Sequence, residues 1–424
     1  MGFIIDWIVD SIRHNRVAKE NQKSRGVVYY KPSQVGGFVE ANCCYENTLV
    51  SGGDAEIRSE AIDALCIRAA NAGQPVIVLH QSDIVCENKL RTTFSGFQNF
   101  YLANATNRIF DPLYGLNEDQ IVDAIVKTAP KEYCITPDGG AYLSALTGTL
   151  RTKVRNIPLP ALYSLIKNDS VPKLLQSAQL PPAVMPTIQN LYVRGQKEAN
   201  SVNRYIYALK SQCDNVLPQN NQAYRFCCTL EQVVTSGGVL VLDVVSDMND
   251  LYLRLLAEIL NGFVRKGKRF LLILDGLAIT EANGLKALLS SQNNAVGKAV
   301  INEDVYAACE CNKDLFRMLL GRSQKWFVFR HMSDESAMQW SKGFGSYEKI
   351  ETSVNIGRGR TDGSGFGTGH AGWSSSDQHN TGETLYHKEE AKVRSFEIQN
   401  MKPRQGFVYT RADNELAFIT EFVR

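Results

Sequence analysis

A glycine-containing stretch between an extended segment and a helix-period segment has the spacing of a phosphate-binding loop. It reads GGDAEIRS and runs from Gly52 to Ser59. A loop of the pattern GxxxxGK[ST], the Walker A motif, presents backbone N–H groups to phosphates, a Lys to the outer phosphates and a Ser or Thr hydroxyl to magnesium. Gly52 and Ser59 keep that pattern, whereas Ile57 stands at its second Gly and Arg58 at its Lys.

Both substitutions change the chemistry of the loop. A β-branched residue does not readily adopt the backbone angles that Gly supplies, and Arg is a planar fork where Lys is a slim point charge. The acids Asp54 and Glu56 would also repel a triphosphate. The stretch therefore fits a degenerate phosphate loop, and it also fits an ordinary turn before a helix. The candidate nucleotide-binding residues are Gly52, Gly53, Arg58 and Ser59.

A second candidate site lies at the end of the apolar segment FLLILD, residues 270–275. In P-loop motors such a strand, the Walker B motif, ends in Asp-Glu; the Asp positions magnesium-bound water and the Glu polarises the attacking water. Here Asp275 keeps the first acid and Gly276 replaces the second. We expect Ser59 and Asp275 to be the magnesium-side residues, and we find no confident catalytic base.

The order of the elements supports both sites. Strands and helices alternate along the chain, which predicts an α/β protein. The order is an extended segment, the Gly52 loop, a helix, an apolar strand at 76–80, a helical stretch, the strand ending at Asp275 and two further strands. The specific prediction is a RecA-like P-loop NTPase fold with a central, mostly parallel sheet of about five strands and an inserted all-helical lobe. The expected segments are an N-terminal helix at 1–25, the nucleotide-binding domain at 26–116 and 223–356, the inserted helical domain at 117–222, a Gly/Ser-rich mobile loop at 357–383, and C-terminal strands returning to the sheet at 384–424.

Charge balance, cysteine usage and the N-terminal segment limit the cellular location and the binding partners that the sequence allows. The 46 Lys and Arg nearly balance the 44 Asp and Glu, so any nucleic-acid contact must be local. Ten Cys without a CxxC pair and six His at unrelated spacing do not form a zinc pattern and favour reduced thiols in the cytosol. Residues 1–10 form an apolar helical face too short to span a bilayer, which favours a helix packed on its own domain over an interfacial helix. We expect a cytoplasmic protein, at most peripheral at the inner face of the membrane.

With these motifs in this order, the chain from about residue 47 onward resembles the TraG/TraD-type coupling proteins, hexameric ATPases that feed DNA into conjugative type IV secretion systems. The segment NRIFDPL at 107–113 resembles the family's Asn-Pro-Leu segment before its helical domain, and FLLILDGLA at 270–278 resembles its Walker B strand. The segment KVRSFEIQNMKPRQGFV at 392–408 resembles its closing turn and last strand. The resemblance implies Arg58 and Ser59 as phosphate contacts, Asp275 as the metal-side carboxylate, and ATP and Mg as cofactors.

The departures from the family suggest lost catalysis. Compared with the family, the sequence lacks the P-loop Lys, the Walker B Glu, a sensor Gln near Asn302 and the transmembrane anchor. Neither Arg322 nor Arg330 is carried over as an arginine finger. The leading hypothesis is a pseudo-ATPase subunit of a DNA-transfer machine. Its implied partners are single-stranded DNA or a relaxase-like protein, other secretion subunits, and further copies in a homo- or hetero-oligomer.

Two alternatives stay open. The chain could be an active ATP-dependent DNA translocase in which Glu281 or Glu303 substitutes for the missing base. It could also be a nucleotide-independent docking module whose helical lobe at 117–222 recognises a relaxase-like protein.

Overall fold

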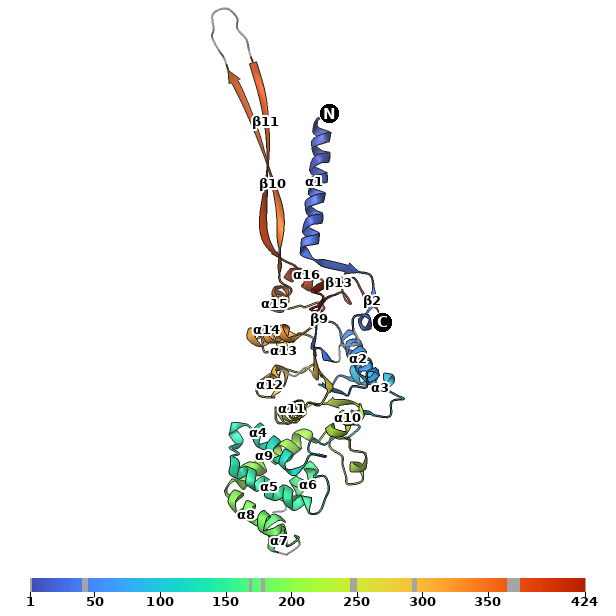
Figure 1. The fold of residues 1–424 in the computed structure, drawn as a ribbon, viewed down its shortest axis with the longest axis vertical. Coiled ribbons are helices and arrows are strands. Elements are labelled where there is room, and N and C mark those ends of the chain that lie inside the picture. Colours follow the sequence, from blue (N-terminus) through green and yellow to red (C-terminus); the bar gives the residue numbers. More distant parts are fainter. Residues whose placement is uncertain are drawn as a thin grey trace, which may run out of the picture.

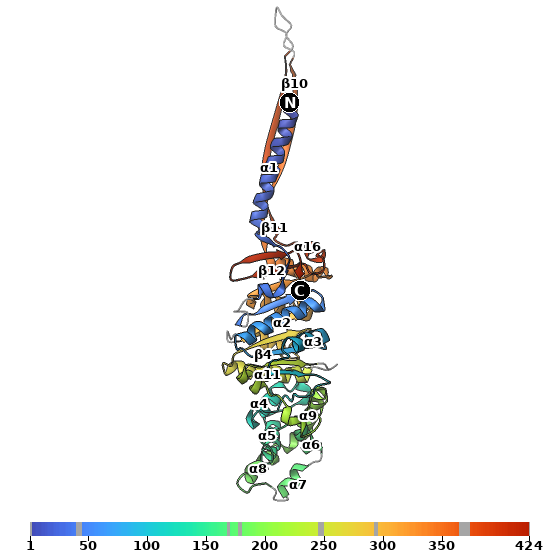
Figure 2. The ribbon, with the colours of Figure 1, turned by 90° about the vertical axis from the view of Figure 1, so that its right-hand side faces the viewer.

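The molecule is elongated, with a helical lobe at one end, an α/β body in the middle and a projecting arm at the other end (Figures 1 and 2). The computed structural model describes residues 2–39, 45–167, 170–176, 180–244, 250–291, 296–363 and 374–423. Both views place the body between the lobe and the arm, and the body contains the candidate loop at Gly52.

A large central sheet forms the body. Its strands are β1 (Val27–Tyr30), β3 (Thr48–Ser51), β4 (Val76–His80), β5 (Phe100–Ala103), β6 (Val239–Asp243), β7 (Phe270–Asp275), β8 (Val296–Asn302), β9 (Lys325–Val328), β12 (Gly406–Thr410) and β13 (Glu415–Ile419). They lie in the order β1-β13-β12-β9-β3-β8-β7-β4-β6-β5. The run from β9 to β5 is parallel throughout, and only β12 runs antiparallel to its neighbours β9 and β13. The predicted α/β fold with a mostly parallel sheet is confirmed.

The expected core of about five parallel strands is too small, because the parallel run from β9 to β5 has seven strands, to which β12, β13 and β1 are added. The edge strands β1 and β5 have four residues each and bury only part of their side chains. Their sequences, VVYY and FYLA, are apolar at every position, but runs of only four residues carry too little periodicity to identify a strand. The longer apolar runs at the centre of the sheet are therefore easier to recognise than its edges.

Helices cover both faces of the sheet. On one face lie α2 (Ala55–Asn71) and α3 (Ile84–Thr93), and on the other lie α11 (Asp250–Arg265), α12 (Leu285–Ser290), α14 (Lys313–Arg322) and α15 (Asp334–Phe344) (Figure 1). Successive strand residues alternate between the two cores: Val78 packs with the α2 and α3 residues, and Ile77 packs on the opposite side. Because both faces are covered, the central strands must be apolar at nearly every position.

The inserted lobe is entirely helical in its described residues. It contains α4 (Glu118–Thr128), α5 (Pro137–Arg151), α6 (Leu159–Lys167), α7 (Ser170–Gln176), α8 (Met185–Gly195) and α9 (Ala199–Cys213). A capping box formed by Asn117 and Gln120 begins α4. At the end of α8, a Cβ on Gly195 would lie 2.3 Å from the backbone nitrogen of Tyr142, so only glycine permits the close approach of α8 to α5.

A buried aspartate joins the lobe to the body. The Asp111 carboxylate accepts hydrogen bonds from the backbone N–H of Leu113 at 2.9 Å, the backbone N–H of Leu159 at 2.8 Å and the Tyr224 hydroxyl at 2.8 Å. Burial raises the pKa of Asp111 to about 6, against the opposing effect of these donors. The contacts tie the start of α6 and the chain returning from the lobe to one carboxyl group.

The arm consists of α1 (Gly2–Arg25) and an antiparallel hairpin of β10 (Ser346–Gly363) and β11 (Ser374–Ala391). The Asn21 side chain donates to the Ile350 carbonyl at 2.8 Å and accepts from the Ile350 N–H at 2.7 Å. Arg25 pairs with Glu397 at 2.7 Å. These contacts hold α1 beside β10 near the base of the hairpin. The expected packing of residues 1–10 on their own domain concerns side chains outside the described part, and no described helix has the length and apolar character needed to cross a bilayer.

The prediction of a mobile loop at 357–383 is wrong where the structure describes the chain. Residues 357–363 and 374–383 belong to β10 and β11, and residues 364–373 lie outside the described part. The prediction rested on the lack of apolar residues to bury. A hairpin ladder satisfies backbone groups between its own two strands, and this contribution does not appear in a count of apolar residues.

We predict that Asp111→Ala lowers the free energy of unfolding of the lobe by about 3 kcal/mol or more, because it leaves three buried donors unpaired. Urea denaturation together with limited proteolysis within residues 117–222 measures the effect. The exposed Asp119 serves as the matched control, and Asp119→Ala should change stability by less than about 0.5 kcal/mol. Equal behaviour of the two variants would contradict the role of Asp111 as a joint.

Candidate functional site

The predicted loop connects a central parallel strand to a helix. Residues Gly52 to Asp54 link β3 to α2, and β8 separates β3 from β7 in the sheet. Gly52 and Gly53 both have positive φ, 84° and 80°. The Gly52 N–H donates to the Asn302 carbonyl at 3.1 Å, and a Cβ on Gly52 would lie 2.8 Å from the Arg330 carbonyl oxygen. Glycine is therefore required at position 52 by both its backbone conformation and its surroundings.

The chain itself caps the helix that follows the loop. α2 begins at Ala55, and the Asp54 carboxylate accepts the Ile57 N–H at 2.8 Å. The free N–H groups at a helix N-terminus are the groups that bind an anion such as phosphate. In this chain a carboxylate of the loop occupies that position as the N-cap.

The two residues expected to contact phosphate and magnesium are engaged within the chain. The Arg58 Nη1 donates to the Gly53 carbonyl at 2.8 Å and lies 3.7 Å from Glu303 Oε1. The Ser59 hydroxyl donates to the Glu56 carbonyl at 2.8 Å, and Ser59 is only 3% exposed. Arg58 thus folds back over the loop, and Ser59 makes its contact inside α2.

Asp275 ends β7 in a buried position, 2% exposed. Burial, together with charge repulsion and a hydrogen bond from Asp83, raises its pKa to about 7, against the opposing effect of the Arg58 charge. Its Oδ2 atom has no hydrogen-bond partner among the described residues. The structure thus brings Asp275 within electrostatic reach of Arg58, as the order of the motifs predicts, and adds a second acid beside it.

That second acid belongs to a cluster which sequence reasoning missed. The Asp83 N–H donates to His80 Nδ1 at 3.2 Å, and His80 Nε2 lies 3.6 Å from Glu87 Oε1. Burial lowers the pKa of His80, which favours its neutral form despite the nearby acids. The available signal was that the apolar strand β4, adjacent to β7, ends in a polar residue. No group of three or more His, Cys, Asp or Glu among the described residues is arranged to hold a metal ion.

The proposed substitute bases differ in position. Glu281 is 81% exposed and pairs with Lys286, whereas Glu303 is 79% exposed and lies beside Arg58. Of these two, only Glu303 is next to the loop. Arg322 and Arg330 both make hydrogen bonds within the chain and are not assigned as arginine fingers. The Arg322 side chain donates to the Ser290 carbonyl, and the Arg330 Nε donates to the Gln399 carbonyl at 3.1 Å.

Solved structures of a bacterial coupling protein resemble this chain in overall fold. The plasmid coupling protein TrwB in complex with ADP and Mg²⁺ matches with a TM-score of 0.56 at 12% identity, covering 93% of this chain and 89% of that one. An unbound form of the bacterial conjugative coupling protein TrwBΔN70 matches with a TM-score of 0.53 at 13% identity, covering 90% and 86%. The chain has the fold of a conjugative coupling protein. No protein-family profile and no curated sequence matches it, so at this identity the likeness concerns the coupling-protein fold alone.

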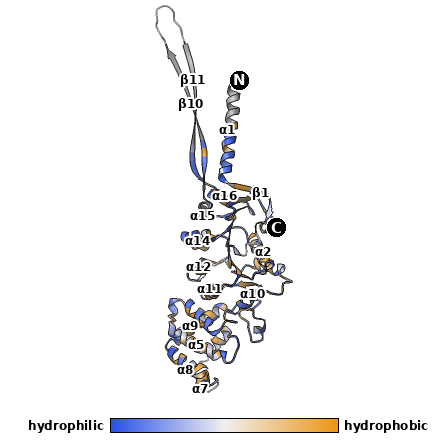
Figure 3. Cartoon of the chain, viewed as in Figure 1, coloured by the Kyte–Doolittle hydropathy of each residue, from blue (hydrophilic) through white to orange (hydrophobic). Residues whose placement is uncertain are grey.

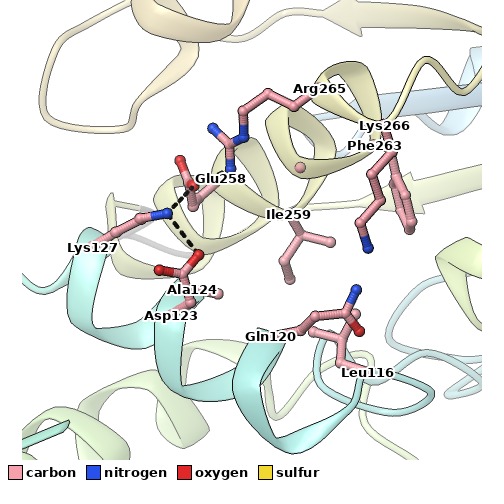
Figure 4. Close-up of a pocket in the computed structure, with 11 residues that line it drawn as sticks. Leu116, Gln120, Asp123, Ala124, Lys127, Glu258, Ile259, Phe263, Arg265 and Lys266 are labelled. Atoms are coloured by element: carbon pink, nitrogen blue, oxygen red, sulfur yellow. Dashed lines mark hydrogen bonds and ion pairs between the residues drawn. The ribbon is translucent and has the colours of Figure 1, made fainter.

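Within this coupling-protein fold, a groove of about 310 Å³ lies between α4 of the lobe and α11 of the body (Figure 4). Its floor includes Ile259 and Phe263. Lys127 crosses the groove, 2.6 Å from Asp123 on its own helix and 3.9 Å from Glu258 on α11. The groove marks the joint between lobe and body and is lined by different residues from the Gly52 loop.

The raised pKa of Asp275 has a consequence for stability. Between about pH 4 and about pH 7 the folded chain keeps a proton that the unfolded chain has lost, so the free energy of unfolding falls as the pH rises through this range. We predict that Asp275→Asn, which stays neutral, is more stable than the wild type at about pH 8 by on the order of 2–4 kcal/mol. The two proteins should converge near pH 4.

Chemical denaturation as a function of pH tests this prediction. The exposed Asp123 offers a control, since Asp123→Asn should follow the wild-type pH profile. A wild-type profile that is flat from pH 4 to pH 8, or an Asp275→Asn variant that is less stable at every pH, would contradict a raised pKa for Asp275.

Proposed function

We propose that this chain is a coupling-protein-like subunit of a conjugative DNA-transfer or type IV secretion machine that has lost ATP hydrolysis. The observation that carries the proposal is the Asp54 carboxylate at the N-terminus of α2, where a phosphate would bind. The fold supports the assignment as a coupling-protein-like subunit, and the contacts of the Gly52 loop support the loss of ATP hydrolysis.

The loop residues do not fit a bound triphosphate in this arrangement. Asp54 places a negative charge at the anion position, and Arg58 is turned toward the Gly53 carbonyl and Glu303. The Ser59 hydroxyl is buried and already used. A nucleotide would have to displace the cap, reorient Arg58 and free Ser59 before it gained any contact.

The missing base supports loss of hydrolysis as well. Gly276 stands where the Walker B motif has Glu, so this position carries no side chain. Its φ of 66° is a conformation that favours glycine. General-base catalysis contributes roughly 10²- to 10⁴-fold to a rate and needs a group within hydrogen-bond reach of the water. An active translocase would need Glu303 in that role, and its carboxylate lies beside Arg58.

The proposed assembly follows from the fold. Coupling-protein-like subunits would assemble with each other or with other secretion subunits, and single-stranded DNA or a relaxase-like protein would be the cargo. In this proposal the chain acts as a structural subunit at the inner face of the membrane, and the lobe and the arm supply its contacts.

We predict that the wild type binds Mg-ATP no more tightly than about 1 mM and shows no steady-state ATP turnover with or without single-stranded DNA. The triple variant Asp54→Gly, Ile57→Gly, Arg58→Lys removes the internal cap and restores the GxxxxGK[ST] pattern. It should gain magnesium-dependent nucleotide binding by calorimetry while still lacking turnover, because position 276 remains Gly.

The double variant Ile57→Gly, Arg58→Lys is the matched control for the cap. If the Asp54 carboxylate blocks the anion position, the double variant binds ATP much more weakly than the triple variant. Wild-type turnover comparable to that of an active motor, and abolished by Asp275→Ala, would refute the pseudo-ATPase proposal and favour the active translocase.

A further inference from the structure

A cleft of about 480 Å³ opens on the helical lobe, between the end of α5, the helices α6 and α7, and the chain returning to the body at residues 221–224. Figure 1 shows α5, α6 and α7 in the part of the lobe remote from the arm. The volume is within the range of roughly 300–1,000 Å³ that accommodates a ligand or several side chains of a partner. The cleft is on a different part of the molecule from the Gly52 loop.

The floor of the cleft is aliphatic. It includes Leu150 at the end of α5, Ala161 and Leu165 on α6, and Leu174 on α7, together with Pro158. Figure 3 shows hydrophobic residues gathered at α7 at this end of the molecule. An aliphatic floor open to solvent favours an occupant that brings apolar side chains of its own.

The rim of the cleft is basic. Lys153 lines it directly, and the exposed side chains of Arg155, Lys167 and Lys173 belong to the segments that form its edges. None of the described residues that line the cleft is acidic. None of these four cations forms an ion pair with a described carboxylate, whereas the neighbouring Arg151 is paired with Glu118 at 3.6 Å.

The acid bonded to the lining residue Tyr224 is shielded. Asp111 is 1% exposed, and it accepts the hydroxyl hydrogen of Tyr224, whose side chain lines the cleft. The Asp111 charge is therefore held by buried donors behind the wall. Among the described residues of the segments that form the cleft between 149 and 174, the exposed charges nearest the opening are cations.

We propose that this cleft binds an acidic amphipathic segment of a partner protein, with apolar side chains on the floor and carboxylates against Lys153 and Arg155. The helix-in-groove mode combines these two features: apolar anchors enter a hydrophobic groove while charge complementarity sets the orientation. This inference does not depend on whether the chain binds nucleotide, because the cleft and the Gly52 loop share no residues.

A nucleic-acid strand fits the cleft less well. Sites for single-stranded nucleic acid combine basic residues with aromatic rings on which bases stack. The described lining has one aromatic side chain, Tyr224, and its hydroxyl is directed to Asp111. The aliphatic and proline floor offers packing for Leu-like side chains and no stacking platform.

The test uses the full chain and a fluorescein-labelled helical peptide of Glu, Leu and Ala with its Leu residues on one face. Fluorescence anisotropy should show binding of this peptide, and a peptide with Lys in place of Glu should not bind. The double variant Lys153→Glu, Arg155→Glu should weaken binding by about tenfold or more, because it reverses the charge of the rim. Ala161→Glu, which places a charge on the floor, should weaken it as well.

Lys131→Glu is the matched control, since Lys131 is an exposed lysine of the same lobe outside the cleft, and it should leave binding unchanged within about twofold. Thermal unfolding of each variant shows whether the lobe is still folded. Equal binding by the charge-reversed and control variants, or no binding of the acidic peptide to the wild type, would overturn the proposal. A thymidine oligonucleotide that binds in place of the peptide and depends on Lys153 and Arg155 would overturn it in favour of a nucleic-acid site.

Discussion

The parallel sheet covered on both faces by helices is the constraint on which this molecule depends. Such a sheet satisfies its backbone internally and buries apolar side chains on two sides, so polar chemistry can exist only at the ends of its strands. The carboxyl ends of β3, β4, β7 and β8 meet at one edge. Gly52, His80, Asp275 and Asn302 come together there because their strands are parallel neighbours, and not because they are close in the chain.

The chemistry of this edge is dominated by carboxylates. Asp54, Asp83 and Asp275 face a limited number of positive groups, chiefly Arg58. A working phosphate loop concentrates backbone N–H groups and a Lys to attract a polyanion. This edge instead satisfies its helix N-terminus with a carboxylate of its own and raises the pKa of a buried acid. These internal contacts occupy the end of α2 and the edge beside β7 in a chain with the fold of a coupling protein.

The two projections from the body are attached in different ways. The lobe joins through Asp111, a single buried carboxylate that collects donors from separate segments, and through the groove at α4 and α11. Within the arm, Asn21 of α1 pairs with the backbone of β10, and the Arg25–Glu397 ion pair ties the end of α1 to the chain that follows the hairpin.

The sequence by itself determined the framework of this protein. The strands ending at His80 and Asp275 and the glycine turn at Gly52 are readable because a strand buried on both faces must be apolar and a positive φ favours glycine. Only the tertiary structure decided that β10 and β11 form a hairpin, that the edge of the sheet includes β1 and β5, and that Asp83 lies against Asp275. These features depend on pairing between distant segments, and local composition carries no information about the partner. The surroundings of the Gly52 loop belong to the second group for the same reason, since the Arg330 carbonyl beside Gly52 and Glu303 beside Arg58 come from distant segments.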